Sequence, residues 1–187
     1  MLDKQKADVL IACQELQRHG MIARVRGSVS VIDRQAGLIV LAYSRDTLVV
    51  NLEGTILEGS QTSAPDLADH IAVYQAFPEI GSIVQPHARF ATVFAQVGMD
   101  IPVLGSFHTD HFQTGIPCVS SVAELRGTFL EKGIDPMNTP AALVLSHCAF
   151  AWGATALDAA YHAIALEDIA NLAYHTMQLD PGIRPIL

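Results

Sequence analysis

The sequence predicts a single α/β domain over residues 1–187, with helices flanking a mainly antiparallel central β-sheet. Short apolar runs alternate with longer segments that repeat apolar side chains every three or four positions, a mixture typical of strands and helices. Half of the 187 residues are apolar, which is enough for one sizeable core. The first strand-like runs are joined by short connections, which favours antiparallel pairing.

The N-terminal part begins with a helix and continues with strands. Residues 5–18 carry apolar side chains at helical spacing, and Gly20 is placed to end the helix. Residues 25–31 alternate valines with polar residues, as a strand with one buried face does. Residues 38–41 and 48–52 follow as further strands, separated by glycine and acidic turn residues.

The remaining elements alternate between helix and strand. Pro65 and Asp66 are suited to start a helix, and Pro78 ends it. The expected order is a helix over 66–77, a strand over 81–84, a helix over 90–97, an irregular loop and strand region over 101–121, a strand over 141–146, a helix over 155–178 and an extended tail. The sequence contains no repeat or low-complexity segment.

Composition excludes several classes of protein. A formal net charge of −8 argues against general nucleic-acid binding, which needs a basic face. No apolar stretch approaches the roughly 20 residues that span a bilayer, and the N-terminus does not resemble a signal peptide. Only 16% of residues are charged, so we expect surplus apolar surface to be buried between subunits of a homo-oligomer.

The three cysteines are sparse and contain no C-x-x-C pair: Cys13, Cys118 and Cys148. Such a set fits free thiols in a reducing cytoplasm. Cys148 follows His147 and could be a ligand or a nucleophile, but a small buried residue is the favoured interpretation.

Two histidines each follow an apolar run that we interpret as a buried strand. His87 ends the segment 81–87, and His147 ends the segment 141–147. Functional residues concentrate where strands end, and two imidazoles can bind one divalent metal ion. Gln85 occupies the position, two residues before His87, where a third histidine would complete such a set.

A second cluster lies in the segment 107–112, where His108 and His111 flank Asp110. It could supply a metal ligand, a proton shuttle or only a hydrogen-bonded turn, and these alternatives stay open. Three other histidines are expected on the surface or in packing: His19, His162 and His175.

Eight segments follow one another in a specific order: 27–30, 37–40, 71–81, 83–92, 101–105, 108–110, 132–136 and 146–153. In this order they resemble the class II aldolase/adducin family, most closely its L-ribulose-5-phosphate 4-epimerase and L-fuculose-phosphate aldolase group. The resemblance covers most of the chain. It implies a three-layer fold and an enzyme that stabilises an enolate or enediolate during aldol cleavage, decarboxylation or epimerisation next to a carbonyl.

The resemblance also implies site residues. A divalent metal would be held by His87 and His147, with Gln85 in place of the family's third histidine. Zinc is the usual metal of the family, whereas a glutamine oxygen suits Mn, Co, Fe or Mg better. Asp66 falls on the family's acidic residue, as a ligand or an acid/base. Asp110 falls on a carboxylate that reaches a neighbouring subunit's site, which implies a tetramer with sites near subunit interfaces.

Three departures separate this chain from the family. The family's phosphate-binding K-P-S-G-like and S-S-D-like segments correspond here to residues 42–45 and 64–66. Ser28, Ser44 and Arg45 are then the expected substrate-binding residues, with Arg45 supplying positive charge. A strand between the Asp110 region and residues 141–146 is missing, and so is the C-terminal extension that carries a catalytic tyrosine in the epimerases.

These observations leave three hypotheses. The first is a metal-dependent enzyme of the aldolase or epimerase type acting on a sugar-like phosphate. The second is the same fold redeployed for a substrate without phosphate, for instance in secondary metabolism, with His108 or His111 joining the metal or acting as acid/base. The third is a non-catalytic assembly module like the adducin head. The acidic and imidazole side chains that remain weigh against the third.

Overall fold

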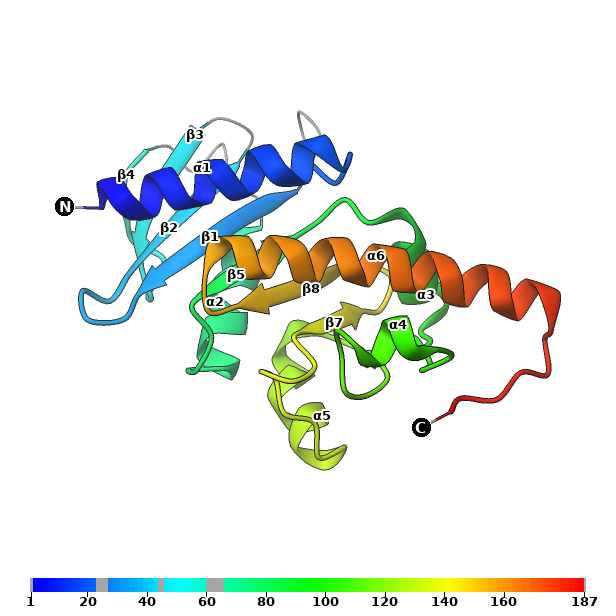
Figure 1. Ribbon diagram of the computed structural model, residues 1–187. Coiled ribbons are helices and arrows are strands. Elements are labelled where there is room, and N and C mark those ends of the chain that lie inside the picture. Colours follow the sequence, from blue (N-terminus) through cyan, green and yellow to red (C-terminus); the bar gives the residue numbers. More distant parts are fainter. Residues whose placement is uncertain (1, 23–26, 44–45, 60–65, 187) are drawn as a thin grey trace.

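A β-sheet forms the middle of the molecule, with helices on both of its faces (Figure 1). The computed structural model describes residues 2–22, 27–43, 46–59 and 66–186. Within these residues, eight strands are hydrogen-bonded in the order β4-β3-β2-β1-β5-β8-β7-β6. The strands are β1 (Ser28–Asp33), β2 (Leu38–Tyr43), β3 (Asp46–Asn51), β4 (Ile56–Glu58), β5 (Ser82–Gln85), β6 (Cys118–Val119), β7 (Ala141–Val144) and β8 (Cys148–Gly153).

Antiparallel pairing dominates the sheet, as the sequence predicts. The pairs from β4 through β1, β5 and β8 to β7 are all antiparallel, and β6 pairs with β7 in parallel. β6 has two residues and lies at the edge, and the chain then enters helix directly at Val122. β6 therefore provides a short strand between Asp110 and β7, and the expectation that the strand in this part of the chain is missing is corrected.

The helices make the sheet the centre of three layers. α1, α3 and α6 pack on one face with β1, β5 and β8, whereas α2 and α5 pack on the other. The helical elements are α1 (Asp3–Arg18), α2 (Leu67–Ala76), α3 (Arg89–Val97), α4 (Ser106–Thr109), the 3₁₀ turn η2 (Val122–Glu124), α5 (Leu125–Glu131) and α6 (Ala156–Leu179). The predicted single α/β domain is confirmed.

Local chemistry explains where the helices begin and end. Thr155 and Asp158 form a capping box at the start of α6, in which each side chain accepts the other's backbone N–H. The carboxylate of Glu167 accepts hydrogen bonds from the backbone N–H groups of Phe90 and Ala91, which have no partner within the first turn of α3. α3 ends at Gly98, whose φ of 70° is left-handed.

Two strands were not expected from the sequence. β8 occupies residues 148–153, where the sequence predicts a connection between His147 and the last helix, and β4 is a short strand after β3. β8 forms because a tight turn at Ser146 and His147 folds the chain back onto β7, with the His147 amide donating to the Val144 carbonyl at 3.0 Å. All six of its residues are buried, so no alternation revealed it.

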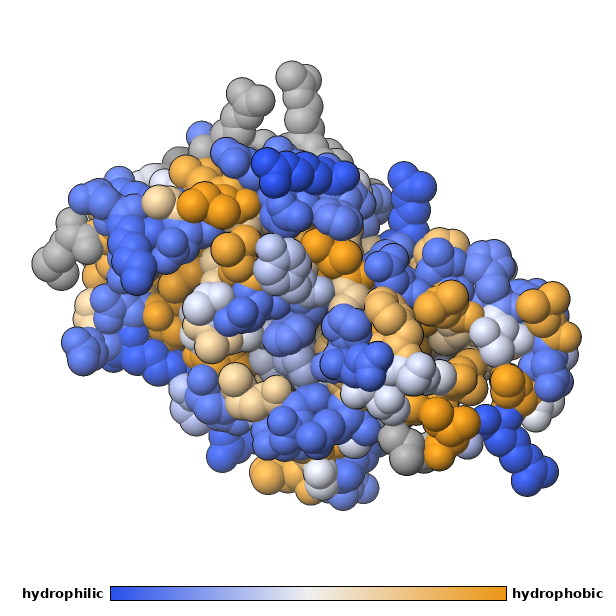
Figure 2. Space-filling model, viewed as in Figure 1, coloured by the Kyte–Doolittle hydropathy of each residue, from blue (hydrophilic) through white to orange (hydrophobic). Residues whose placement is uncertain are grey.

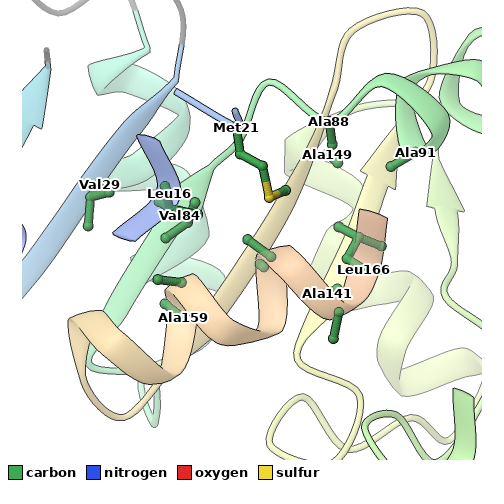
Figure 3. Packing of buried hydrophobic residues seen from close by; sticks show 14 of the residues in the cluster. Leu16, Met21, Val29, Val84, Ala88, Ala91, Ala141, Ala149, Ala159 and Leu166 are labelled. Carbon is green, nitrogen blue, oxygen red and sulfur yellow. The ribbon is translucent and has the colours of Figure 1, made fainter. Parts of the chain in front are cut away.

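The face formed by α1 and α6 shows how apolar side chains are distributed. Inside, small and branched side chains interdigitate between α6 and the sheet (Figure 3). Outside, several apolar residues lie among polar ones toward the C-terminal half of α6 (Figure 2); Leu172 is 57% exposed there, and Phe107 on α4 is 40% exposed. Among the described helices, none is both long and apolar enough to cross a membrane.

Candidate active site

The end of β5 and the starts of β1 and β8 meet on the face of the sheet that α2 covers. Ser28 of β1 pairs directly with Gln85 of β5, so their side chains lie side by side. Gly27 precedes them with a φ of +91°, and an added Cβ would lie 2.9 Å from Ile22 Cγ1 and 3.3 Å from the Gln85 carbonyl oxygen. Only glycine fits there without movement, and this close approach brings Ser28 to Gln85.

The first turn of α2 supplies two carboxylates and an imidazole. Asp66, Asp69 and His70 are separated by three and four positions, so they lie along one side of the helix start. Asp66 Oδ2 lies 3.5 Å from Ser28 Oγ. Asp69 Oδ2 lies 2.9 Å from His147 Nε2, across from the turn between β7 and β8. The helix start therefore joins the sheet at two points.

These acidic groups affect one another. Burial raises the pKa of Asp66 above its ordinary value, and the Asp69 carboxylate raises it further, while the Ser28 hydroxyl and His147 oppose the shift. Burial raises the pKa of the Cys148 thiol as well, and Asp69 and Asp66 add to that rise. Neither carboxylate forms an ion pair with a lysine or arginine among the described residues. The arrangement thus favours a bound positive charge.

Gln85 has an oxygen without a partner. Its side chain is buried, and Oε1 forms no hydrogen bond with any described residue. A buried acceptor without a donor costs about 1–3 kcal/mol, so such an atom points to a ligand. The amide oxygen of Gln85, the carboxylate of Asp69 and the imidazole of His147 are donor types that suit a divalent metal ion.

The two histidines proposed as ligands differ in surroundings. His147 lies in the hairpin turn, 48% exposed and bonded to Asp69. Continuing the β5–β8 register past Val84 would carry His87 toward Cys148, but the His87 ring forms no hydrogen bond with a described residue. In the parts of the chain that the structure describes, no three His, Cys, Asp or Glu side chains gather closely enough to hold a metal. Their convergence on one ion stays a prediction.

The other predicted catalytic residues lie elsewhere in this chain. α4 packs beside α6, on the opposite face of the sheet from α2. His108 is buried there and bonds the Thr114 carbonyl at 2.8 Å, and burial lowers its pKa. His111 is exposed and bonds the Phe107 carbonyl. Asp110 is exposed, and its carboxylate contacts no described charged group. Its reach into a neighbouring subunit stays a prediction.

The substrate-binding residues predicted from the family are only partly within the described chain. Ser28 lies in the site, beside Asp66. Ser44 and Arg45 lie outside the described residues.

Two residues of the site were missed by sequence reasoning. Asp69 and His70 received no role, although their spacing from Asp66 on a predicted helix start was a usable signal. The alternation in β1 was also misleading, because Ser28 and Ser30 are as buried as Val29. The sheet is covered on both faces, so polar residues of β1 face α2 instead of solvent.

Comparison with known proteins identifies the family. The profile of the Class II Aldolase and Adducin N-terminal domain matches residues 7–174. This chain belongs to the class II aldolase and adducin family. It is 36% identical over 206 aligned positions to the L-ribulose-5-phosphate 4-epimerase UlaF of Salmonella paratyphi A (strain ATCC 9150 / SARB42), covering 99% of this chain and 90% of that protein.

Solved structures agree on the fold. An L-fuculose 1-phosphate aldolase superposes with a TM-score of 0.81 at 18% identity, covering 98% of this chain and 92% of the other. The L-fuculose-1-phosphate aldolase of Thermus thermophilus superposes with a TM-score of 0.72 at 23% identity, covering 97% and 100%. These relatives are enzymes, and the expectation that this chain is an enzyme of the aldolase and epimerase family is confirmed. These comparisons weigh against the hypothesis of a non-catalytic assembly module.

Proposed function

We propose that this chain is a divalent-metal-dependent enzyme that epimerises or cleaves a phosphorylated ketose next to its carbonyl group, with L-ribulose 5-phosphate as the first substrate to test. The observation that carries the proposal is the group of acidic and imidazole side chains at the start of α2 and the β7–β8 turn. It occurs in a chain that is 36% identical over nearly its full length to L-ribulose-5-phosphate 4-epimerases. A second support is the buried amide oxygen of Gln85, which lacks a donor.

We propose His87, His147 and Asp69 as metal ligands, with Gln85 as a neutral oxygen ligand. Two atoms held at a right angle on one ion lie about 3 Å apart, because such bonds are about 2.1 Å long. The 2.9 Å between Asp69 Oδ2 and His147 Nε2 fits that spacing. The metal would stabilise negative charge that develops on oxygen beside the carbonyl. This ligand set has an oxygen donor, Gln85, where the family has a third histidine. Mn²⁺ or Co²⁺ should therefore bind well relative to Zn²⁺.

Asp66 is the proposed acid/base. Burial raises the pKa of its carboxyl group, and an acid/base works best when its pKa is closer to neutral pH. Its carboxylate contacts Ser28 and not His147, so it is free of the proposed ligand pair. Asp110 of a neighbouring subunit is a second acid/base candidate in a homo-oligomer, and the exposed apolar side chains on α4 and α6 support such an assembly. The free thiols support a cytoplasmic enzyme.

A second function follows from one sequence departure. The segments that replace the family's phosphate-binding turns lack its lysine and two of its hydroxyl donors. Because such groups bind phosphate, the second proposed function is that the same catalytic group acts on a ketose without phosphate.

Metal titration combined with a substrate panel tests the proposal. The chelator-stripped chain is titrated with Zn²⁺, Mn²⁺ and Co²⁺ by calorimetry, and Co²⁺ binding is followed by visible absorption. We expect about one ion per chain, lost in His87→Ala/His147→Ala and weakened about 10-fold or more in Asp69→Asn. A His19→Ala/His175→Ala variant removes two histidines outside the site and should bind normally.

The possible results separate the hypotheses. Turnover of L-ribulose 5-phosphate or L-fuculose 1-phosphate that requires the metal supports the first function. Metal binding with turnover of free ketoses only supports the second. Absence of metal binding under every loading condition would refute both. Gln85→His should raise zinc affinity about 10-fold or more if the ligand geometry is intact.

A further inference from the structure

A row of polar side chains is buried behind the first turn of α2. Four side chains form it: Tyr74, Ser30, His70 and Ser28, all almost completely excluded from solvent. Tyr74 Oη lies 2.9 Å from Ser30 Oγ, and Ser30 Oγ lies 2.7 Å from His70 Nδ1. His70 Nε2 lies 2.8 Å from Ser28 Oγ, which lies 3.5 Å from Asp66 Oδ2. The row thus connects the interior of the core to the carboxylate of the candidate site.

Burial restricts the protonation of the row. The His70 ring is completely buried, and each of its nitrogens contacts a serine hydroxyl and no described carboxylate, so the ring is neutral. A neutral imidazole has one N–H, and therefore one ring nitrogen donates while the other accepts. Each hydroxyl has one hydrogen to donate. The direction of the hydrogen bond at either end therefore sets the direction of every link.

The Asp66 end of the row sets this direction. An ionised Asp66 can only accept, so Ser28 donates to it and must itself accept from His70 Nε2–H. His70 Nδ1 then accepts from Ser30. Because Ser30 uses its one hydrogen on His70 Nδ1, its oxygen accepts from the Tyr74 hydroxyl. All donors of the row then point toward Asp66.

We propose that His70 is a positioning residue: its neutral Nε2–H tautomer holds the Ser28 hydroxyl toward Asp66 and so orients the proposed acid/base. This inference rests on the proposed function. The contact between Ser28 and Asp66 is the longest in the row, so it depends most on the serine keeping one rotamer. Without an N–H behind it, the Ser28 hydroxyl turns toward His70 as easily as toward the carboxylate.

Two substitutions at the same position test the direction of the row. In His70→Gln, the side-chain amide can place an N–H where Nε2 lies, whereas in His70→Asn it reaches only the Nδ1 position. We expect His70→Asn to lower kcat about 10- to 100-fold with little change in KM, and His70→Gln to retain most of the activity. Metal binding should be unchanged in both variants, because neither alters a proposed ligand.

Equal losses of kcat in the two variants, or no loss in either, would overturn the proposal, because a purely structural residue would not discriminate between donor positions. Nitrogen-15 NMR of the histidine rings in the unaltered chain gives a measurement that needs no variant. We expect His70 to be protonated at Nε2 only at pH 7. A ring protonated at Nδ1, or at both nitrogens, refutes the assignment. If the unaltered chain turns over no ketose, the proposed function fails, and the NMR result still decides the tautomer.

Discussion

The two faces of the sheet bury polar groups in different ways. On the face covered by α1 and α6, buried polar side chains bond to the main chain: Ser82 donates to the Ser30 carbonyl, and His108 bonds the Thr114 carbonyl. On the face covered by α2, side chains bond to one another in a row that ends at Asp66. The first pattern completes the fold, whereas the second delivers a hydrogen-bond donor to the candidate site.

The apolar packing differs in the same sense. α6 approaches the sheet through a row of small side chains, Ala156, Ala159, Ala160, Ala163, Ala170 and Ala173 (Figure 3). On the other face, aromatic rings pack against one another, and the ring centroids of Phe77, Phe129 and Trp152 lie within 5.6 Å of one another. The comparison indicates that stability rests mainly on the α6 face and chemistry on the α2 face. Substitutions on each face can test this division.

The largest expected effect falls on activity, at Asp66. Asp66→Asn removes the proposed acid/base and should lower kcat about 10²- to 10⁴-fold. The free energy of unfolding should change little, because the carboxylate is only partly buried and its hydrogen bond with Ser28 is long. Steady-state kinetics and urea unfolding measure both quantities. Glu131→Gln, at an exposed position on α5, is the control; equal activity in the two variants would exclude Asp66 from the reaction.

The next effect falls on stability, at Leu166. Leu166→Ala opens a cavity between α6 and the sheet and should lower the free energy of unfolding by about 2–5 kcal/mol. The kcat per folded molecule should stay the same. Leu130→Ala on α5 removes an equal volume from a side chain that is 71% exposed, and should cost much less. A comparable loss in both variants would contradict the packing described for α6.

The pH dependence of stability should report on His70. Its folded-state pKa of about 3 lies below the ordinary value of 6.5, so the unfolded chain binds a proton over a pH range where the folded chain does not. Stability is therefore complete above about pH 6.5 and falls as the pH drops toward 3, by at most about 1.4 kcal/mol per pH unit. His70→Gln should reduce this slope in urea titrations between pH 7 and 4. An unchanged slope would assign the effect to His108 alone, whose pKa burial also lowers.

The smallest expected effect lies in the turn that carries His147. Ser146 has a φ of 55°, a left-handed conformation that is unfavourable for residues with a side chain. Ser146→Gly should raise the free energy of unfolding by about 0.5–1 kcal/mol. Ser121, with a φ of −155°, is the matched control, and Ser121→Gly should not stabilise. A loss of stability in Ser146→Gly would show that its side chain contributes more than the backbone strain.

Much of the fold was predictable from local patterns. The helical period over residues 5–18 and 155–178 predicted α1 and α6 within a few residues, and the short connections predicted antiparallel pairing. β8 was not predictable in the same way. Its residues are buried on both sides, and a continuously apolar run has no period that separates a strand from a connection.

The candidate site also contains residues that local sequence identified and residues that only the packed structure revealed. Local sequence identified His87 and His147 at the ends of strands, and the family resemblance added Asp66 and Gln85. Asp69 and His70 became visible only when α2 was packed over β1 and the β7–β8 turn, because their partners are 78 and 42 positions away in the chain. Hydrogen bonds between residues so distant depend on how the layers are packed.

By itself, the sequence determined the fold class, the order of most elements and the two histidines, because period, turn residues and strand ends are local properties of the chain. Only the tertiary structure decided which polar side chains are buried and what they bond. A serine that alternates with valines has the same pattern whether it faces water or a covering helix, and α2 covers Ser28 and Ser30. Covering that face of the sheet turned an apparent surface row into the buried support of the candidate site.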